Sequence, residues 1–487
     1  MGRRTILAGL PAALLATFAL AGCAVGPNYE RPPLASPETF RGESPPPSAT
    51  SLADLPWWEV FNDPTLVALI EESIANNYDL RVAVARVEQA YSGVGVARSE
   101  IFPQLNYGFA ASRGRNSFLG GLSGSNTGTT NYFATALNLS WEIDVWGRIR
   151  RSTEAAQGQY LATDAARRGV ILSLVAGVAQ AYFELLELDA ELAITRNSVD
   201  TFQKTLALFT RQFQGGVASK LEVERAQAAL SQAAASIPRL ESQIVAKEDQ
   251  ICVLLGHPPG PIPRGAVLIE QKTPSPEVPA GLPSALLERR PDLVQAEDLA
   301  FSANANVGVS IANFLPAIGL TSIYGSQSTE LSNLLTKGTG LWGVAGTAAQ
   351  PLFRGGQLYY SYKGAQASLE ETQAQYQGTV LTALQEVADS LSARQKLIES
   401  REQQAVAVTA LEESVRLSLL RYTDGLSNYI EVLDAQQQLF PAQTTLAQIE
   451  RDQLIAVVQL YKALGGGWSL DAAPGTPAPV PPPPPSP

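Results

Sequence analysis

The 487-residue sequence is poor in the side chains from which most catalytic and metal sites are built. It has one histidine and two cysteines, with neither a CxxC nor an HxxxH motif, so it lacks the converging ligands of a zinc or non-haem iron site. It also lacks a glycine-rich phosphate loop, a nucleophile elbow and paired carboxylates with a base. The single histidine, His257, lies in a proline-rich stretch. These absences argue against an enzyme and predict no catalytic residue, no metal and no cofactor.

Charged residues are also scarce, at 17% of the chain, and the formal net charge is -11. No basic stripe compensates for this charge, so the phosphates of nucleic acid would be repelled. Ala, Leu, Gln and Ser are abundant instead, and this composition favours long helices that pack closely on one another. Cys252 lies in an apolar pattern and is expected to pack as a small hydrophobe. The cysteines therefore predict no disulfide framework.

The first 22 residues resemble a bacterial lipoprotein signal. Two arginines precede an apolar run from Ile6 to Ala21, which is short for a bilayer span. The run ends in LAGC at 20–23, similar to a lipobox, in which the cysteine becomes the lipid-modified first residue of the mature protein. The resemblance implies N-acyl and S-diacylglycerol chains on Cys23, and Ala24 implies sorting to the outer membrane. Each buried methylene contributes about 0.8 kcal/mol, so several acyl chains would anchor the protein firmly.

One stretch near the middle of the chain returns in the second half. The segment RQFQGGVASKLEVERAQAAL at 211–230 matches RYTDGLSNYIEVLDAQQQL at 421–439, about 209 residues later. Each copy places a glycine-containing turn between two long runs of helical apolar spacing, which is typical of a helix that ends before its antiparallel partner. The sequence therefore predicts an internal two-fold repeat.

Each half also carries a pair of segments in which apolar residues alternate with small or polar ones over about ten positions. The pairs span about 103–143 and about 316–352. Their length, terminal aromatics and few charges are typical of transmembrane β-strands. Four strands cannot close a barrel, and an open sheet edge does not survive in lipid. A membrane-spanning form therefore needs eight strands from two chains or twelve from three.

The helical runs that follow each strand pair have apolar residues at steps of three and four, typical of a coiled-coil seam. Pro238 and Pro441 are expected to kink or interrupt the returning helices. In chain order the sequence predicts a signal peptide (1–22), an N-terminal strap or equatorial segment (23–63) and a first repeat (64–256). A proline-rich connector or equatorial segment (257–283), a second repeat (284–466) and a proline-rich tail (467–487) follow. The long helical hairpins of the two repeats are expected at about 148–256 and about 356–466.

Five motifs together resemble the TolC-like outer-membrane efflux factors, and most closely their NodT-type lipoprotein branch. They are the lipobox at Cys23, WWEVFNDPTL at 57–66, WEIDVWGRIR at 141–150, QPLFRGGQL at 350–358 and RYTDGLSNYIEVLDAQ at 421–436. The resemblance covers nearly all of the mature chain, in order and in both halves. It implies an α+β membrane protein and selects three chains over two. The trimer would form a twelve-stranded β-barrel in the outer membrane. This barrel would continue into a long periplasmic α-helical barrel, which an equatorial domain surrounds.

The same resemblance implies a function, the exit duct of a tripartite efflux pump. A periplasmic adaptor and an inner-membrane transporter, expected to be of the resistance-nodulation-division type, would meet the periplasmic end. Carried over by motif position, the adaptor-docking residues are Gly216, Val217, Ala218 and Ser219 in the first turn and Gly425, Leu426, Ser427 and Asn428 in the second. The outer-membrane lipid and two further copies of the chain complete the expected partners.

The resemblance also implies a gate just inside the second turn, made of a ring of apolar side chains and a ring of aspartates. The matching positions are Ile430 and Asp434, whereas the first copy has Leu221 and Arg225. Three converging aspartates repel one another and favour cations. Some family members have a basic partner for the aspartate at the position of Gln437. The sequence therefore does not decide whether a salt bridge latches the gate. The competing interpretation makes Asp434 a solvated carboxylate and Ile430 a core side chain.

Other functions stay open at this point. One alternative is the outer-membrane duct of a type I protein secretion system. A second, of a different class, is a periplasmic coiled-coil adaptor or structural lipoprotein, although an adaptor would carry lipoyl-like β-domains in place of the strand pairs. Tyr422 and Phe213 are expected to pack under the turns. The sequence does not specify the substrate, so a drug, metal, dye or protein all fit.

Overall fold

The computed structural model describes residues 24–33, 37, 39–41, 52–61, 63–115, 129–271 and 283–467. The predicted signal peptide, the lipidation residue Cys23 and all but the first residue of the predicted proline-rich tail lie outside these residues. The chain divides into two compact units. Unit 1 comprises Met1–Pro33, Arg86–Thr163 and Gln295–Tyr376, and unit 2 comprises Leu34–Ala85, Asp164–Val294 and Gln377–Pro487.

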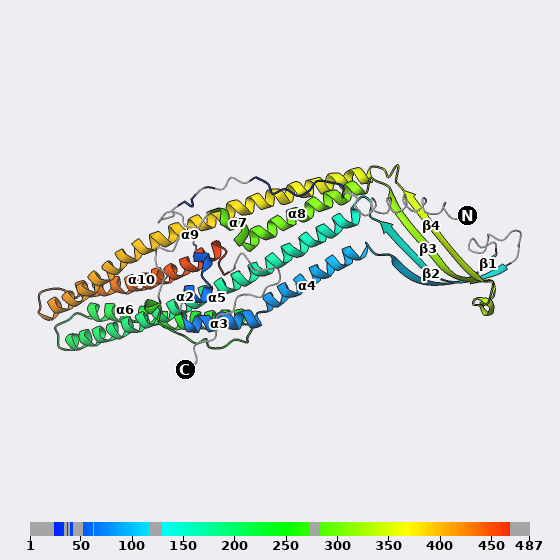
Figure 1. The fold of residues 1–487 in the computed structure, drawn as a ribbon. Coiled ribbons are helices and arrows are strands. Elements are labelled where there is room, and N and C mark those ends of the chain that lie inside the picture. The colour runs from blue at the N-terminus through cyan, green and yellow to red at the C-terminus, as the bar shows by residue number, and fades with distance from the viewer. Residues whose placement is uncertain are drawn as a thin grey trace, which may run out of the picture. The chain divides into compact units, whose positions relative to one another are not determined.

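The first half of the chain passes through short helices into a strand pair and then a long helical hairpin (Figure 1). Asp63 starts the first of the longer helices, because its carboxylate accepts the backbone N–H of Thr65 at 2.8 Å and Pro64 supplies a helical φ at the first position. The elements are η1 (Leu52–Asp54), α2 (Trp57–Phe61), α3 (Pro64–Asn76), α4 (Tyr78–Ser99), β1 (Gln104–Arg115), β2 (Thr129–Ile143), α5 (Arg148–Gln214), α6 (Lys220–Leu255) and η2 (Leu268–Glu270).

The second half repeats this order. Its elements are η3 (Pro283–Ala285), α7 (Leu286–Arg289), α8 (Pro291–Ala312), β3 (Ala317–Ser328), η4 (Leu331–Asn333), β4 (Gly340–Ala349), α9 (Gln357–Thr423) and α10 (Tyr429–Ala463). Helices α5 and α9 have 67 residues each, and they begin about 209 positions apart, the interval of the repeated segment. The predicted strand pairs and long helical hairpins are therefore confirmed.

The two internal prolines do not interrupt the returning helices. Pro238 lies inside α6 and Pro441 inside α10, and both helices continue past them. Of the two predicted effects, a kink or an interruption, the interruption is therefore wrong. A proline removes one backbone donor, but a helix of 35 or 36 residues keeps the rest of its hydrogen bonds and its packed apolar face.

The strands form one antiparallel four-stranded sheet in the order β1-β2-β3-β4. The register pairs Tyr107 with Leu137, Leu137 with Tyr324, and Tyr324 with Trp342. Because successive side chains point to opposite faces, these four residues share one face of the sheet. The edges of this sheet are β1 and β4, and within the described chain neither edge strand has a second neighbour.

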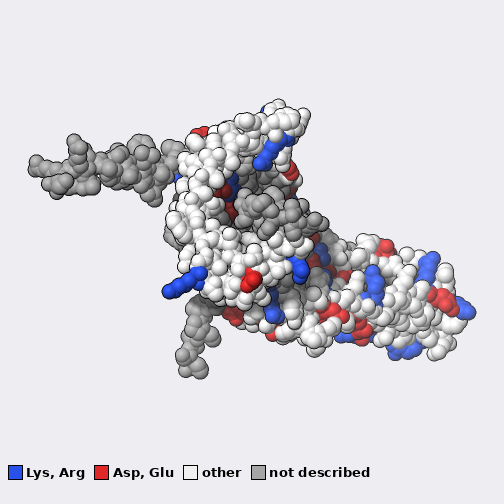
Figure 2. All heavy atoms as spheres, turned by 90° about the vertical axis from the view of Figure 1, so that its right-hand side faces the viewer, with Lys and Arg blue, Asp and Glu red and all other residues white. Residues whose placement is uncertain are grey.

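The two faces of the sheet differ in chemistry. One face carries large apolar and aromatic side chains, among them Leu105, Tyr107, Phe109, Leu137, Leu139, Trp141, Leu320, Tyr324, Trp342 and Val344. The other face, apart from Tyr132, Ile323 and Leu341, carries small or polar ones such as Asn106, Gly108, Ser112, Asn138, Ser140, Gly319, Thr321, Gly343 and Thr347. In Figure 2 the upper part of the surface is mostly without charged side chains, whereas they are frequent toward the lower right. The division between the two faces of the sheet is typical of a strand with lipid on one side and water on the other.

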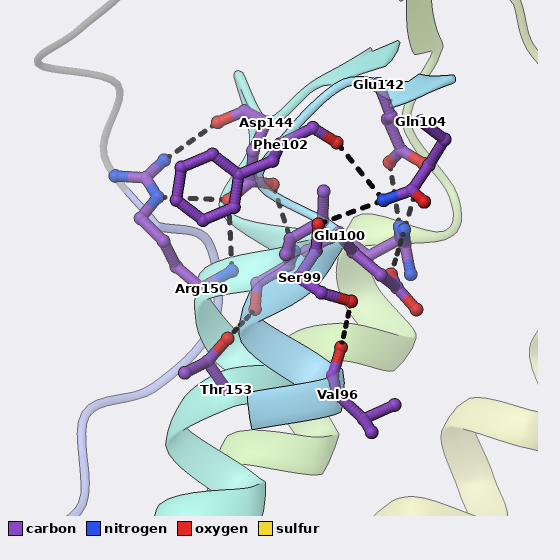
Figure 3. A network of polar contacts seen from close by, with 11 residues as sticks. Val96, Ser99, Glu100, Phe102, Gln104, Glu142, Asp144, Arg150 and Thr153 are labelled. Carbon is purple, nitrogen blue, oxygen red and sulfur yellow. Dashed lines mark hydrogen bonds and ion pairs between the residues drawn. The ribbon is translucent and has the colours of Figure 1, made fainter. Parts of the chain in front are cut away.

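The WEIDVWGRIR motif forms the junction between β2 and α5 within unit 1. Asp144 accepts two backbone N–H groups at the start of α5, each at 3.0 Å. Arg148 forms a two-bond ion pair with Glu142, at 2.8 and 2.9 Å, and reaches Glu100 after α4 at 3.0 Å. Glu100, Glu142, Asp144 and Arg150 gather from these elements (Figure 3). The motif therefore orders the first turn of α5 and fastens it to the strands.

Helix α5 supplies much of the core of unit 2. One stretch of 18 residues in it is apolar enough to cross a membrane, with a mean hydropathy of 1.7, but 67% of that stretch is buried in the chain's own fold. Tyr182, Phe183 and Leu185 are among its fully buried side chains. Packing against neighbouring elements therefore accounts for the apolar character of α5.

Candidate functional site

Both repeated turns close in the same way because each has a glycine just past the helix end. In the first turn Gly216 has a φ of 75°, and the N–H of Val217 donates to the carbonyl of Gln212 at 2.9 Å. In the second, Gly425 has a φ of 71°, and the N–H of Leu426 donates to the carbonyl of Arg421 at 2.8 Å. Only glycine adopts this left-handed conformation cheaply, and the hydrogen bonds satisfy carbonyls at the helix end.

The residue before each returning helix is a helix cap. The Ser219 hydroxyl accepts the N–H of Glu222, and the Glu222 carboxylate accepts the N–H of Ser219 at 2.6 Å, which is a complete capping box. Asn428 caps α10 by accepting the N–H of Ile430 at 3.5 Å. Two predicted docking residues, Ser219 and Asn428, therefore also hold the turns in shape.

The turns expose apolar side chains at matched positions. Val217 is 82% exposed and its counterpart Leu426 is 70% exposed. Leu221 and its counterpart Ile430 are also exposed, the latter by 51%. A Cβ added at Gly216 or Gly425 would meet no atom within 4 Å, so both turns are open to a partner. Contiguous exposed apolar residues mark an interaction surface more often than a solvated one.

Beneath the turns an aromatic cluster joins the two hairpins within unit 2. The ring centroids of Phe209 and Tyr429 lie 3.9 Å apart, and those of Phe209 and Tyr422 lie 5.5 Å apart. The Tyr422 hydroxyl donates to the Gln212 side-chain oxygen, and burial raises the pKa of Tyr429 to about 12. Tyr422 therefore packs under the turns as predicted. Phe213 is exposed instead, so that half of the prediction is wrong.

The predicted gate residues lie one helical turn apart on the exposed face of α10. Tyr429, Val432 and Leu433 form the buried face, which places Ile430 and Asp434 on the opposite side. The alternative that Ile430 is a core side chain is therefore wrong for the single chain.

Asp434 has a partner that sequence reasoning missed. Its Oδ2 accepts a hydrogen bond from Nε2 of Gln438 at 2.7 Å. The spacing of four residues on one helix was the available signal. Gln437 is exposed, as is Arg225 in the first copy.

Two further polar residues in this cluster were not predicted. Gln436 is buried, and its Nε2 donates to Thr205 of the first hairpin at 3.4 Å, while its side-chain oxygen has no partner among the described residues. The side-chain oxygen of Gln212 accepts the hydrogen bond from the Tyr422 hydroxyl. A glutamine within a buried apolar stripe was the available signal for Gln436, whereas no local pattern points to Gln212.

A buried carboxylate joins α5 to α10 farther along unit 2. Oε2 of Glu187 lies 3.4 Å from Nη1 of Arg451, and Arg451 also pairs with Asp452 at 2.7 Å. Burial raises the pKa of Glu187 to about 7 against the opposing effect of Arg451. Glu187 is therefore sensitive to pH near neutrality.

A family model described as outer membrane efflux protein matches residues 69–257 and 282–466. The two matched ranges correspond to the two halves of the chain, so the predicted internal repeat is confirmed. The family is one of channels and not of enzymes, as the sequence predicted.

Individual relatives agree with this match. The toluene efflux pump outer membrane protein TtgC of Pseudomonas putida is 35% identical over 459 residues, which cover 93% of this chain and 94% of TtgC. The probable outer membrane lipoprotein SilC of Salmonella typhimurium is 33% identical over 454 residues, 93% of this chain and 97% of SilC.

A solved structure has the same fold. The open state of the MtrE outer membrane channel of Neisseria gonorrhoeae superposes with a TM-score of 0.82 at 31% identity, covering 91% of this chain and 98% of MtrE. The TolC-like fold of four strands and long helices is thereby confirmed. The chain belongs to the outer membrane efflux protein family and is an outer-membrane efflux channel protein with a periplasmic helical part.

Proposed function

We propose that three copies of this chain form the exit duct of a tripartite efflux pump. The observation that carries this proposal is the sheet, which has an apolar and a polar face and two open edges, β1 and β4. Open edges are costly in lipid, so β4 of one copy is expected to pair with β1 of the next until twelve strands close. The small and polar face then lines a water-filled passage.

Cross-linking and conductance test the duct. Protein purified from the outer membrane should give chemically cross-linked trimers and a steady conductance in planar lipid bilayers. Protein that forms neither trimers nor channels would refute the proposal. The type I secretion alternative predicts loss of an exported protein when the gene is deleted, whereas the efflux proposal predicts sensitivity to small toxic compounds.

A periplasmic adaptor, itself bound to an inner-membrane transporter of the resistance-nodulation-division type, is proposed to dock on the two turns. The exposed side chains of Val217 and Leu426 support this assignment, since both stand on turns whose shape is fixed by caps and glycines. The remaining proposed contacts are Gly216, Ala218, Ser219, Gly425, Ser427 and Asn428. Toluene export is named for TtgC, but no residue described above selects one substrate class.

The gate is proposed to consist of Ile430 and Asp434. Their shared exposed face supports this, because three copies of that face around one axis would form an apolar ring and an acidic ring. The partner of Asp434 within the chain is a neutral glutamine, so the acidic ring would keep its charge. Such a ring attracts cations and repels anions.

Lipidation at Cys23 and an equatorial domain formed by 23–63 and 257–283 complete the proposal. The residues after Cys23 are held firmly within unit 1: the N–H of Val25 donates to the carbonyl of Trp146 at 3.0 Å, and Arg151 donates to the side chain of Asn28 at 2.9 Å. This attachment lies directly after β2, where an acyl chain would meet the membrane. Labelling with a radioactive fatty acid should be lost in Cys23→Ala.

A further inference from the structure

The order of the strands fixes which ends of two adjoining copies meet. Neighbouring strands in the sheet are antiparallel, so β4 of one copy would run antiparallel to β1 of the next. The end of β4 at Ala349 then lies beside the start of β1 at Gln104. The segment after β4 (350–356) and the segment before β1 (100–103) would therefore face each other across the boundary between copies.

The internal repeat supplies a template for this contact. Within one chain, the segment after β2 already contacts the segment before β3: Ile143 pairs with Ile318, and Nε1 of Trp146 donates to the carbonyl of Pro316 at 2.8 Å. The segment after β4 is the repeat of the segment after β2. The segment before β1 is likewise the repeat of the segment before β3. The contact between copies should therefore copy the contact within a chain.

One hydrogen bond that occurs in both halves confirms this correspondence. Nε1 of Trp141 donates to the carbonyl of Ile101 at 2.8 Å, and Nε2 of Gln350 donates to the carbonyl of Phe314 at 3.0 Å. Trp141 and Gln350 are separated by the interval of the repeat. In both halves, a side chain near the end of one strand donates to the short segment that precedes the neighbouring strand. The segments before β1 and before β3 therefore have a defined position.

The second half lacks the tryptophan that makes the contact in the first. Gly355 occupies the place of Trp146, and Phe353 occupies that of Asp144, which caps α5 in the first half. Leu352 and Phe353 are 94% and 88% exposed in the single chain. On the other edge Phe102 is 59% exposed (Figure 3), although the Gln104 side chain and the Trp141 ring hold its segment in place.

We propose that Leu352 and Phe353 of one copy pack against Ile101 and Phe102 of the adjoining copy. This inference rests on the proposed function, in which copies meet edge to edge. Between copies, apolar packing would take the place of the Trp146 hydrogen bond that makes the corresponding contact within one chain. This packing would also cover Leu352 and Phe353, which are highly exposed in the single chain. The contact fastens the boundary between copies at the helical end of the strands, where the sheet passes into the helices.

A disulfide test addresses the contact directly. The full-length variant Phe102→Cys/Phe353→Cys is made in a Cys252→Ser background, which removes the free buried cysteine. After mild oxidation in the outer membrane, a non-reducing denaturing gel should show covalent dimers and trimers that a reductant dissolves. Each single variant should remain monomeric on the gel. The control pair Phe102→Cys/Val344→Cys should not cross-link, because Val344 lies in the middle of β4.

The outcomes separate this inference from the proposed function. If an amine-reactive cross-linker yields trimers but the cysteine pair forms no disulfide, the contact is refuted and the duct stands. If the wild-type protein gives no trimers at all, the proposed function fails, and the inference fails with it.

A second measurement uses loss of packing. Phe353→Ser should lower the temperature at which the trimer dissociates, because an apolar side chain is lost from the boundary between copies. Leu335→Ser is a matched control, because Leu335 is also exposed but lies in the loop between β3 and β4, at the other end of the strands. Equal dissociation temperatures for Phe353→Ser and the wild type would overturn the inference.

Discussion

The hydroxyl of Tyr422 donates a hydrogen bond to the side-chain oxygen of Gln212, and this bond joins the ends of the two long helices of the repeat. Tyr422 belongs to the last turn of α9 and Gln212 to the last turn of α5. Tyr429, its neighbour in the aromatic cluster, has a buried hydroxyl without a hydrogen-bond partner in the described part of the chain. The second turn is therefore held to the first hairpin by this polar bond and by ring packing, and Gln436 adds a bond to Thr205 farther along α10.

Tyr422→Phe should loosen the packing of the second turn on the first hairpin, because the bond to Gln212 is lost. Loss of one such bond costs about 1 kcal/mol, which makes local opening about fivefold more frequent. Hydrogen exchange of the backbone amides around the second turn should therefore be faster. Tyr429→Phe is the matched control: it removes a hydroxyl that has no hydrogen-bond partner among the described residues, so exchange should be unchanged or slower. Faster exchange in both variants would show that the Tyr422–Gln212 bond is not the cause.

Asp434→Ala should raise conductance and reduce the preference for cations, because the proposed ring of three carboxylates disappears. Reversal potentials in a salt gradient measure the preference. Asp200→Ala serves as the control, since Asp200 is an exposed helical aspartate paired with Lys204, away from the turns. Unchanged conductance and selectivity in Asp434→Ala would remove this residue from the gate.

Gly425→Val should abolish efflux while trimers still form. The φ of 71° at this position costs a residue with a branched Cβ roughly 1–2 kcal/mol or more, so the turn would change shape where the adaptor is proposed to dock. Survival on toxic compounds and cross-linking measure the two effects. Gly378→Val, in the middle of α9 with open space around its Cα, should export normally. Normal export by Gly425→Val would show that docking does not need this turn.

Glu187 should make stability depend on pH. Its pKa is raised from 4.5 to about 7 by burial, so the folded state binds a proton more tightly than the unfolded state. The stabilising contribution is complete below pH 4.5 and is lost as the pH rises through about 7. Thermal unfolding in detergent at several pH values should show this loss, and Glu187→Gln should flatten it.

Glu184→Gln provides a comparison of opposite sign. Burial acts to raise the pKa of Glu184, but hydrogen bonds from Lys247 and Gln180 outweigh it and hold this pKa below its usual value. The stability contributed by Glu184 is therefore present above its unfolded pKa and lost as the pH falls. If the unfolding temperature depended on pH in the same way in Glu187→Gln and in Glu184→Gln, the assignment to Glu187 would be contradicted.

The turns were predictable because their causes are local. A glycine past a helix end and a Ser or Asn before the next helix specify the backbone within a few residues, and the repeat showed the pattern twice. The strand pairs were predictable for the same reason, since alternation and length are properties of short segments.

The contacts between segments were not predictable from the sequence. Gln212 lies about 210 residues before Tyr422, and no pattern in one chain pairs them. The exposure of Phe213 was misjudged because its helical spacing places it on the seam, whereas Ala218, Tyr422 and Tyr429 fill the space beneath the turns. The partner of Asp434, in contrast, is local: Gln438 lies four residues along the same helix, a spacing that brings two side chains together.

The mass of the intact protein in detergent tests the central claim most directly. The purified, lipid-anchored protein is expected to have the mass of three chains by native mass spectrometry, because the proposed barrel of twelve strands takes four strands from each chain. A stable mass of one or two chains, from protein that still conducts ions in a bilayer, would contradict the account.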